Sequence, residues 1–288
     1  MNETMTVPGT LYLSATPIGN LEDMTYRSVR ILGEVGLIAA EDTRHTRKLL
    51  AHYDIHTPLT SYHEHNKLTK GPELIAYLQG GGDLVCVSDA GLPGIADPGS
   101  HLAGLAIAAG IRVTPLPGAN AALSALICSG LDTTVFTFVG FLPRTTKKRR
   151  ETLERVKEHS ETLLFYEAPH HLRATLAELA AALGAGRKAV AARELTKKFE
   201  EFRRGTLQEL QDYFSVQEPR GEFVLLVAGN DGCQQAAPDV YAGLGSAALV
   251  ARLVADGLDR KAAMREAAQR LGMSRRDVYQ ACLAGDDA

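Results

Sequence analysis

Residues 83–99 read DLVCVSDAGLPGIADPG, an apolar run followed directly by a loop rich in glycine and proline. Because residues 84–87 are all apolar, the run predicts a parallel strand that is buried on both faces of a sheet. The loop at 88–99 holds three glycines and two prolines in twelve residues, which favours a rigid bend with exposed main-chain amides and carbonyls. It contains no lysine or arginine, so we expect it to bind a zwitterionic or weakly charged ligand rather than a phosphate.

Short strands alternate with helical segments on both sides of this stretch, which is typical of an α/β fold. A break with two prolines and one glycine, PLPGAN at 115–120, separates two such series. We therefore expect one α/β lobe at residues 1–116 and a second at 117–230. Residues 199–205 alternate in polarity and predict a strand that pairs antiparallel nearby. The other predicted strands are 10–16, 37–43, 58–64, 83–88, 112–116, 135–141, 162–167, 188–196 and 222–227.

The last fifty residues have a different pattern. Residues 229–238 have the composition of a linker, and residues 239–288 predict helices only. One helix has an apolar stripe at Met264, Ala267, Ala268 and Leu271 and ends at Gly272. The next begins at Ser274, with Asp277 as a partial capping box, and has apolar pairs at Val278 and Cys282 and at Tyr279 and Leu283. The two helices predict either a helix-turn-helix, a motif that can contact nucleic acid, or a plain helical hairpin.

Composition limits the class of protein. The 288 residues are 45% hydrophobic and 23% charged, with a formal net charge of −3, which excludes a disordered chain and a uniformly cationic coat but not a local basic patch. Cysteines stand alone at 86, 128, 233 and 282, and no C-x-x-C pair occurs, which favours reduced thiols. The first nine residues do not resemble a signal peptide, and no run of about 18 apolar residues occurs, so we predict a cytoplasmic protein without a membrane partner.

Several known motifs are absent. The chain has no G-x-G-x-x-G after its first strand, no P-loop, no H-E-x-x-H and no G-x-S-x-G. His63, Glu64 and His65 are adjacent, but alternate residues of a strand point to opposite faces, so we predict no metal there. Polar or Gly/Pro-rich clusters instead follow the predicted strands, where ligands bind in open parallel sheets, and they predict one shared cleft. These clusters are 17–20, 41–44, 62–64, 89–99, 117–120, 166–169 and 193–197.

Nine segments, in one order, closely resemble the ribosomal RNA small subunit methyltransferase I family of the tetrapyrrole methylase superfamily. The resemblance covers about residues 10–230, and the terminal helices also resemble that family's helix-turn-helix tail. The segments are LYLSATPIGNLEDMT (11–25), LIAAEDTRHTRKLL (37–50), SYHEHN (61–66), VSDAGLPGIADPG (87–99), PLPGANAALSAL (115–126), FVGFLPR (138–144), FYEAPHHL (165–172), ARELTKKFEEFRRGT (192–206) and GEFVLLV (221–227).

The resemblance implies a two-lobed tetrapyrrole-methylase-like fold with parallel and mixed sheets and a small C-terminal helical region. It implies S-adenosylmethionine in the cleft between the lobes, a homodimer, and methyl transfer to the ribose 2′-hydroxyl of a cytidine in the decoding centre of 16S rRNA. Leu92 stands where tetrapyrrole-methylating relatives have an aspartate, which favours the RNA branch. The implied cofactor-binding residues are Ala15, Thr16, Pro17, Ile18, Gly19, Ala90, Gly91, Leu92, Pro93, Ile95, Gly118, Ala119, Asn120, Ala121, Tyr166 and Ala192.

Two of these loops also carry charged side chains suited to proton transfer or phosphate binding. Asp42 has a second interpretation, since it stands where the cap of the following helix is expected. A basic run at 144–150 predicts an RNA-binding surface, although such runs also occur on ordinary solvated helices. The catalytic candidates are Glu41, Asp42, Arg44, Arg193, Glu194 and Lys197, and the RNA-binding candidates are Arg144, Lys147, Lys148, Arg149 and Arg150.

Two alternatives stay open. One is a tetrapyrrole C-methyltransferase of the same superfamily, which Leu92, the basic run and the helical tail disfavour. The other is a nucleic-acid-binding protein that senses S-adenosylmethionine without transferring its methyl group.

Overall fold

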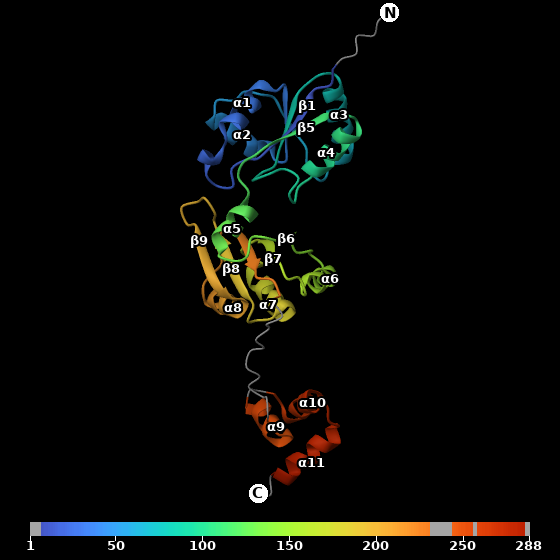
Figure 1. Cartoon of the computed structure of the whole chain (residues 1–288), viewed down its shortest axis with the longest axis vertical. Helices are drawn as coiled ribbons and strands as arrows, with labels where there is room; N and C mark the ends of the chain where they lie inside the picture. The colour runs from blue at the N-terminus through green and yellow to red at the C-terminus, as the bar shows by residue number, and fades with distance from the viewer. Residues whose placement is uncertain (1–6, 231–243, 256–257, 286–288) are drawn as a thin grey trace, which may run out of the picture. The chain divides into compact units, whose positions relative to one another are not determined.

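The computed structural model of the chain describes residues 7–230, 244–255 and 258–285. The chain forms two compact units, Met1–Gln234 and Gln235–Ala288. The first unit contains two five-stranded sheets that share no strand, so we call residues 10–116 lobe 1 and residues 121–227 lobe 2 (Figure 1). The domain boundaries at residues 116, 230 and 239 stay predictions, and most of the expected linker lies outside the described residues.

Lobe 1 is a parallel sheet covered on both faces by helices. Figure 1 shows α1 and α2 on one side of its strands and α3 and α4 on the other. Successive residues of the central strand, at 84–87, point to opposite faces of the sheet. Leu84 packs with Leu74 and Leu102 on one face, and Val85 packs with Ile38 on the other. This explains why the run at 84–87 is apolar throughout. The sheet order is β3 (Leu59–Ser61), β2 (Leu37–Ala40), β4 (Leu84–Val87), β1 (Thr10–Ser14) and β5 (Arg112–Leu116), and the helices are η1 (Leu21–Asp23), α1 (Tyr26–Glu34), α2 (Thr43–His52), α3 (Lys67–Gln79) and α4 (Gly99–Ala108).

Lobe 2 is a mixed sheet, in which only the first pair of strands is parallel. Leu164 faces α5, whereas Phe165 faces α6, α7 and α8, so this sheet is also covered on both faces. The sheet order is β6 (Phe136–Phe141), β7 (Thr162–Glu167), β10 (Phe223–Val227), β8 (Lys188–Arg193) and β9 (Glu201–Thr206), and the helices are α5 (Ala121–Ser129), α6 (Thr146–Val156), α7 (Leu172–Leu183) and α8 (Leu207–Val216).

The predicted α/β class and the position of every predicted strand are confirmed. Five strands end earlier than predicted: three stop three residues early, at Ala40, Ser61 and Arg193, and β1 and β4 stop at Ser14 and Val87 rather than at residues 16 and 88. In the first case the cause is a helix cap, because the side chain of Asp42 accepts a hydrogen bond from the amide of Arg44 and so begins α2. The extra polar residues therefore belong to the loops beyond the sheets.

The second unit consists of α9 (Ser246–Ala255), α10 (Arg260–Leu271) and α11 (Arg275–Gly285). As predicted, Gly272 ends α10 in the left-handed region, with φ at 63°. Val278 and Cys282 are buried as predicted, but Leu271 is 37% and Tyr279 is 52% exposed, so neither belongs to the core. Ala263, Ala267 and Ala268 fill that core with Leu249, Val250 and Leu253, because small side chains let helices approach closely.

In the parts that the structure describes, no helix has the length and apolar character required to cross a bilayer. Cys86 and Cys282 are buried free thiols and Cys128 is an exposed one, whereas Cys233 lies outside the described residues.

Candidate active site

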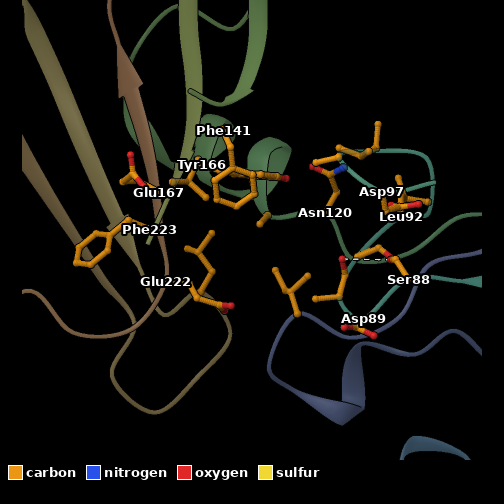
Figure 2. A pocket seen from close by; sticks show the side chains of 18 of the residues that line it. Ser88, Asp89, Leu92, Asp97, Asn120, Phe141, Tyr166, Glu167, Glu222 and Phe223 are labelled. Atoms are coloured by element: carbon orange, nitrogen blue, oxygen red, sulfur yellow. Dashed lines mark hydrogen bonds between the residues drawn. The ribbon is translucent and has the colours of Figure 1, made fainter. Parts of the chain in front are cut away.

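A cavity of about 320 Å³ lies between the loops of lobe 1 and lobe 2. Lobe 1 contributes the loop after β4, and lobe 2 contributes the ends of β6 and β7, the start of β10 and residues 194–197. Figure 2 shows Ser88, Asp89 and Leu92 on one side of the space and Tyr166 and Glu222 on the other. Six of the seven predicted loop clusters contribute residues to this cavity, whereas the cluster at 62–64 does not.

Hydrogen bonds within lobe 1 hold the loop after β4 in place. The main chains of Thr16 and Gly91 exchange two hydrogen bonds, at 2.9 and 3.0 Å. The Asp97 carboxylate accepts from the amides of Gly94 at 2.8 Å and of Gly99 at 2.7 Å. Gly91 and Gly94 have φ angles of 80° and 92°, which side chains disfavour. The bend is therefore rigid as expected, but these three glycine amides are engaged inside the protein and are not open to a ligand.

Glu41 lines the cavity, whereas its neighbour Asp42 does not. Burial raises the pKa of the Glu41 carboxyl, and the negative charge of Asp89 raises it further. Asp42 caps α2 and binds the exposed guanidinium of Arg44 at 2.8 Å, and this hydrogen bond holds the pKa of the Asp42 carboxyl well below its ordinary value. The amide of Asp42 donates to Asp89 at 2.9 Å, which fixes the Glu41 loop against the loop after β4.

Lys197 is clamped by two carboxylates on the lobe 2 side of the cavity. Its Nζ lies 2.9 Å from Oε1 of Glu194 and 3.0 Å from Oε2 of Glu222. Burial opposes the charged forms, but the hydrogen bonds outweigh it: the pKa of Glu194 is lowered and that of Lys197 is raised. A Cβ at Gly19 would lie 2.4 Å from Cγ of Lys197, so the lysine stem packs against lobe 1 where that lobe has no side chain. Glu194 itself has a left-handed φ of 51°.

A cluster of three aromatic side chains forms another edge of the cavity. The ring of Tyr166 makes edge contacts with Phe138 and Phe141, with centroids 5.1 and 5.5 Å apart. Figure 2 shows Phe141 and Tyr166 together above the centre of the cavity. Burial raises the pKa of the Tyr166 hydroxyl, so this wall is neutral and apolar at physiological pH.

Glu167 is buried at the cavity wall with its oxygens already bonded. Oε1 accepts from the amide of Ala168 at 2.9 Å, and Oε2 accepts from the hydroxyl of Thr175 on α7. The same hydroxyl accepts from Arg149 of α6 at 3.0 Å, and Arg149 also pairs with Glu178 at 2.7 Å. Arg149 is therefore committed to α7 and is not part of an open basic surface.

Most of the charged side chains that line the cavity are negative. Six carboxylates line it, and within the described residues Lys197 is the one lysine or arginine that does. A low-dielectric cleft with this charge attracts cations and repels phosphates. S-adenosylmethionine fits this donor set, because it has a sulfonium and an ammonium against a single carboxylate, an aromatic adenine ring and no phosphate. The lining carboxylates are Glu41, Asp89, Asp97, Glu167, Glu194 and Glu222.

The structure brings about half of the predicted cofactor and catalytic residues into the cavity wall. Two of the others support it from behind: Thr16 pairs with Gly91, and Gly118 packs against Ala15 so closely that a Cβ would be 2.8 Å away. The predicted residues that line the cavity are Ile18, Glu41, Ala90, Gly91, Leu92, Ile95, Asn120, Ala121, Tyr166, Glu194 and Lys197. Those outside the lining are Ala15, Thr16, Pro17, Gly19, Asp42, Arg44, Pro93, Gly118, Ala119, Ala192 and Arg193.

Arg193 differs from its expected role because it pairs with Glu201 of β9, at 3.0 Å, rather than facing the cavity. Asn120 caps α5 by accepting from the amide of Leu123 at 2.9 Å, so its side chain has a structural role beside the cavity.

Sequence reasoning missed the wall that β10 provides. Because β10 runs antiparallel to β7 and β8, its first residue Phe223 lies opposite Glu167 and Arg193, the last residues of those strands. Ligands in open parallel sheets bind beyond the carboxyl ends of the strands. In the antiparallel strand β10 it is instead the amino end that lies at the cavity, so this rule did not identify it. The polar stretch before β10, which includes Glu222, was the available signal. Lining residues not among the candidates are Ser88, Asp89, Ala96, Asp97, Phe141, Glu167, Ala168, Leu195, Glu222, Phe223 and Val224.

The basic run begins at Arg144, three residues after Phe141 at the cavity edge, and continues through the first turn of α6 to Arg150 at the start of the second. Arg144, Lys147, Lys148 and Arg150 are exposed. No acidic residue occupies the first turn, although a helix N-terminus favours negative charge. The position is electrostatically unfavourable for cations unless an anion binds there.

His63 and His65 have ring centroids 6.0 Å apart. Among the described residues, no three side chains of histidine, cysteine, aspartate or glutamate gather as a metal site requires.

Comparison with known proteins gives a consistent result. Residues 10–211 match the family of tetrapyrrole (corrin/porphyrin) methylases. The chain is 50% identical to "Ribosomal RNA small subunit methyltransferase I" of Halalkalibacterium halodurans, over 94% of this chain and 93% of that protein. It is 46% identical to the protein of the same name from Bacillus subtilis, over 95% of this chain and 94% of that one.

Solved structures are similar in fold at much lower identity. A uroporphyrin-III C-methyltransferase from Thermus thermophilus superposes with a TM-score of 0.53 at 20% identity, covering 76% of this chain and 94% of that one. Diphthine synthase gives a TM-score of 0.57 at 13% identity, covering 76% and 89%. The fold of lobes 1 and 2 therefore recurs in proteins with different names.

Proposed function

Because the chain belongs to the tetrapyrrole methylase family, we propose that it transfers a methyl group from S-adenosylmethionine to the RNA of the small ribosomal subunit. The acceptor proposed is the ribose 2′-hydroxyl of a cytidine in the decoding centre of 16S rRNA. The observation that carries the proposal is the cavity lined by six carboxylates and one lysine, which suits a sulfonium donor. The relatives at 46–50% identity carry the name of an RNA methyltransferase, which supports the substrate class.

The loop after β4, Asn120 and Tyr166 would hold the donor. Leu92, Ile95 and Tyr166 supply apolar surface for the adenosine, and Asp89 and Asp97 supply negative charge for the cationic groups. When bound, S-adenosylmethionine supplies an electrophilic methyl group, so the protein must mainly align the acceptor oxygen. Such alignment contributes on the order of 7 to 11 kcal/mol in favourable cases.

Glu41 is the proposed proton acceptor. The new bond joins the ribose 2′-oxygen to the methyl carbon while the bond from that carbon to sulfur breaks, and the hydroxyl proton passes to the Glu41 carboxylate. A carboxylate whose pKa is raised towards neutrality is a better base than an ordinary one. Lys197 cannot take this role, because the two carboxylates that clamp it stabilise its charged form.

The cavity repels the phosphates of the RNA that must approach it. The exposed cations at the start of α6 offer the compensating charge beside the cavity edge. We infer that Arg144, Lys147, Lys148 and Arg150 bind flanking phosphates while one ribose enters the cavity, and that Arg149 maintains the helix position.

A homodimer is also proposed, through an apolar face of lobe 2 made by Leu123 and Ile127 of α5 and Phe136, Phe138 and Phe141 of β6. All five side chains are between 37% and 75% exposed. Phe138 and Phe141 lie opposite Leu164 and Tyr166, which places them on the face of the sheet that α5 covers. β6 is an edge strand, and exposed apolar edges favour association. A second copy would cover this face and the adjacent cavity edge.

The test is methyl incorporation from labelled donor into small subunits that lack the modification, followed by alkaline hydrolysis. A 2′-O-methyl group removes the nucleophile for strand cleavage, so we expect one alkali-resistant linkage at a cytidine. Label in an alkali-sensitive linkage would show base methylation and contradict the proposed acceptor. Label in a free porphyrinoid but not in RNA would favour the tetrapyrrole alternative, and donor binding without transfer to either would favour a sensor.

A further inference from the structure

The second unit has an exposed basic face on α11, to which the proposed function assigns no role. In α11, Val278 and Cys282 point into the small core, whereas Arg275, Arg276, Tyr279 and Gln280 are exposed. These four exposed residues are spaced i, i+1, i+4 and i+5 and therefore lie on one face of the helix. We call these four residues the α11 face.

The turn before α11 fixes the direction of this helix. Gly272 adopts the left-handed region, and the amide of Met273 donates to the carbonyl of Ala268 at 3.0 Å, which ends α10. The hydroxyl of Ser274 accepts from the amide of Asp277 at 3.2 Å, which starts α11. Three residues thus join two helices that pack on α9, the arrangement in which a third helix presents its exposed N-terminal residues to nucleic acid.

Charge favours a polyanion as the partner of this face. Residues 258–285 contain six lysines and arginines against three acidic residues, on a chain whose formal net charge is −3. Neither Arg275 nor Arg276 forms an ion pair with any residue in the described parts of the chain. Both lie in the first turn of α11, where the helix dipole disfavours positive charge. The acidic residue of that turn, Asp277, is bonded to the hydroxyl of Ser274 at 2.7 Å rather than to either arginine, so both guanidinium groups remain available to an anion.

Tyr279 adds a feature specific to RNA. It is 52% exposed beside the two arginines, and an exposed aromatic ring can stack on an unpaired base. We propose that the α11 face is a second RNA-binding site, which contacts single-stranded or looped RNA outside the segment that enters the cavity. The inference rests on the proposed function, because it takes its RNA from the same substrate.

The experiment measures binding of the full-length protein to a 16S rRNA transcript over a series of salt concentrations. We expect the double substitution R275Q/R276Q to weaken binding roughly tenfold and to lower the slope of log affinity against log salt by about 1.4 to 1.8, since each phosphate contact contributes about 0.7 to 0.9. R275K/R276K should keep the slope, and Tyr279→Ala should weaken binding without changing it. Donor affinity should be the same in all variants.

The matched control is R112Q/K188Q, which removes two exposed charges from the starts of β5 and β8, at the ends of those strands away from the cavity. Equal RNA affinity and slope for R275Q/R276Q and this control would overturn the inference. So would a defect seen only with assembled subunits, because it would indicate a protein partner. If the wild type binds RNA but methylates none, the proposed function fails, whereas the binding comparison still decides the role of α11.

Discussion

Glu41 is the proposed proton acceptor, and the burial that raises the pKa of its carboxyl also makes its ionised form unfavourable in the folded protein. It stands directly after β2, where the sheet ends, and burial together with Asp89 raises the pKa of its carboxyl. Its raised pKa means that the folded protein binds the proton more tightly than the unfolded chain does. The contribution of Glu41 to stability is therefore present at low pH and is lost as the pH rises through its folded pKa.

We predict that Glu41→Gln lowers the rate of methyl transfer by about 100-fold or more, because the proton acceptor is lost. The wild-type rate should fall as the pH drops through the raised pKa of Glu41, and this limb of the pH profile should be absent in the variant. Melting temperature at neutral pH should not decrease. Glu73→Gln, on exposed α3, serves as the control and should behave as the wild type in both measurements.

Asp97 shows that a residue of a predicted loop can shape the site although it was not among the named candidates. Its carboxylate makes three hydrogen bonds to the amides of Gly94 and Gly99. We predict that Asp97→Ala weakens donor binding, measured by calorimetry, and lowers the free energy of unfolding by about 1–3 kcal/mol, since buried donors lose their partner. Asp97→Asn keeps one acceptor oxygen and should lie between the wild type and Asp97→Ala. Unchanged donor affinity in Asp97→Ala would show that the bend does not depend on this carboxylate.

At the scale of elements, α6 separates two kinds of cation that look alike in the sequence. Lys147 and Lys148 are exposed in a first turn without acidic residues and Arg150 is exposed just beyond it, whereas Arg149 is bonded to Glu178 and Thr175 of α7. The helix therefore has a face available to RNA and a face that attaches it to lobe 2.

We predict that K147Q/K148Q/R150Q lowers RNA affinity and its salt dependence while leaving the free energy of unfolding unchanged or slightly higher, because cations at a helix N-terminus are unfavourable. Arg149→Met should instead lower the free energy of unfolding by about 1–3 kcal/mol and leave the salt dependence of RNA affinity unchanged. The measurements are chemical denaturation and RNA binding at several salt concentrations. Similar behaviour of the two variants in both assays would contradict the division of α6 into two faces.

At the scale of the whole molecule, the apolar face of lobe 2 is the feature that favours association. Ile127 is 75% exposed on that face, and Ile107, on α4 of lobe 1, is 66% exposed outside it. If a second copy covers the face, we expect Ile127→Lys to convert a dimer to a monomer in light scattering, because an unpaired charge would be buried. Ile107→Lys is the matched control and should leave the mass unchanged. A wild-type monomer at micromolar concentration would contradict the proposed dimer.

The sequence by itself determined the α/β class, the position of each strand and most of the loops that surround the cavity, because apolar runs and Gly/Pro clusters are local signals. For Asp42 it left two interpretations open, a catalytic carboxylate and a helix cap, and the structure shows the cap. Tertiary structure alone decided that β10 runs antiparallel and brings Glu222 to Lys197, and that Arg149 points inward while Arg150 points outward. Strand direction and side-chain partners depend on residues far apart in the chain, and neither composition nor spacing contains that information.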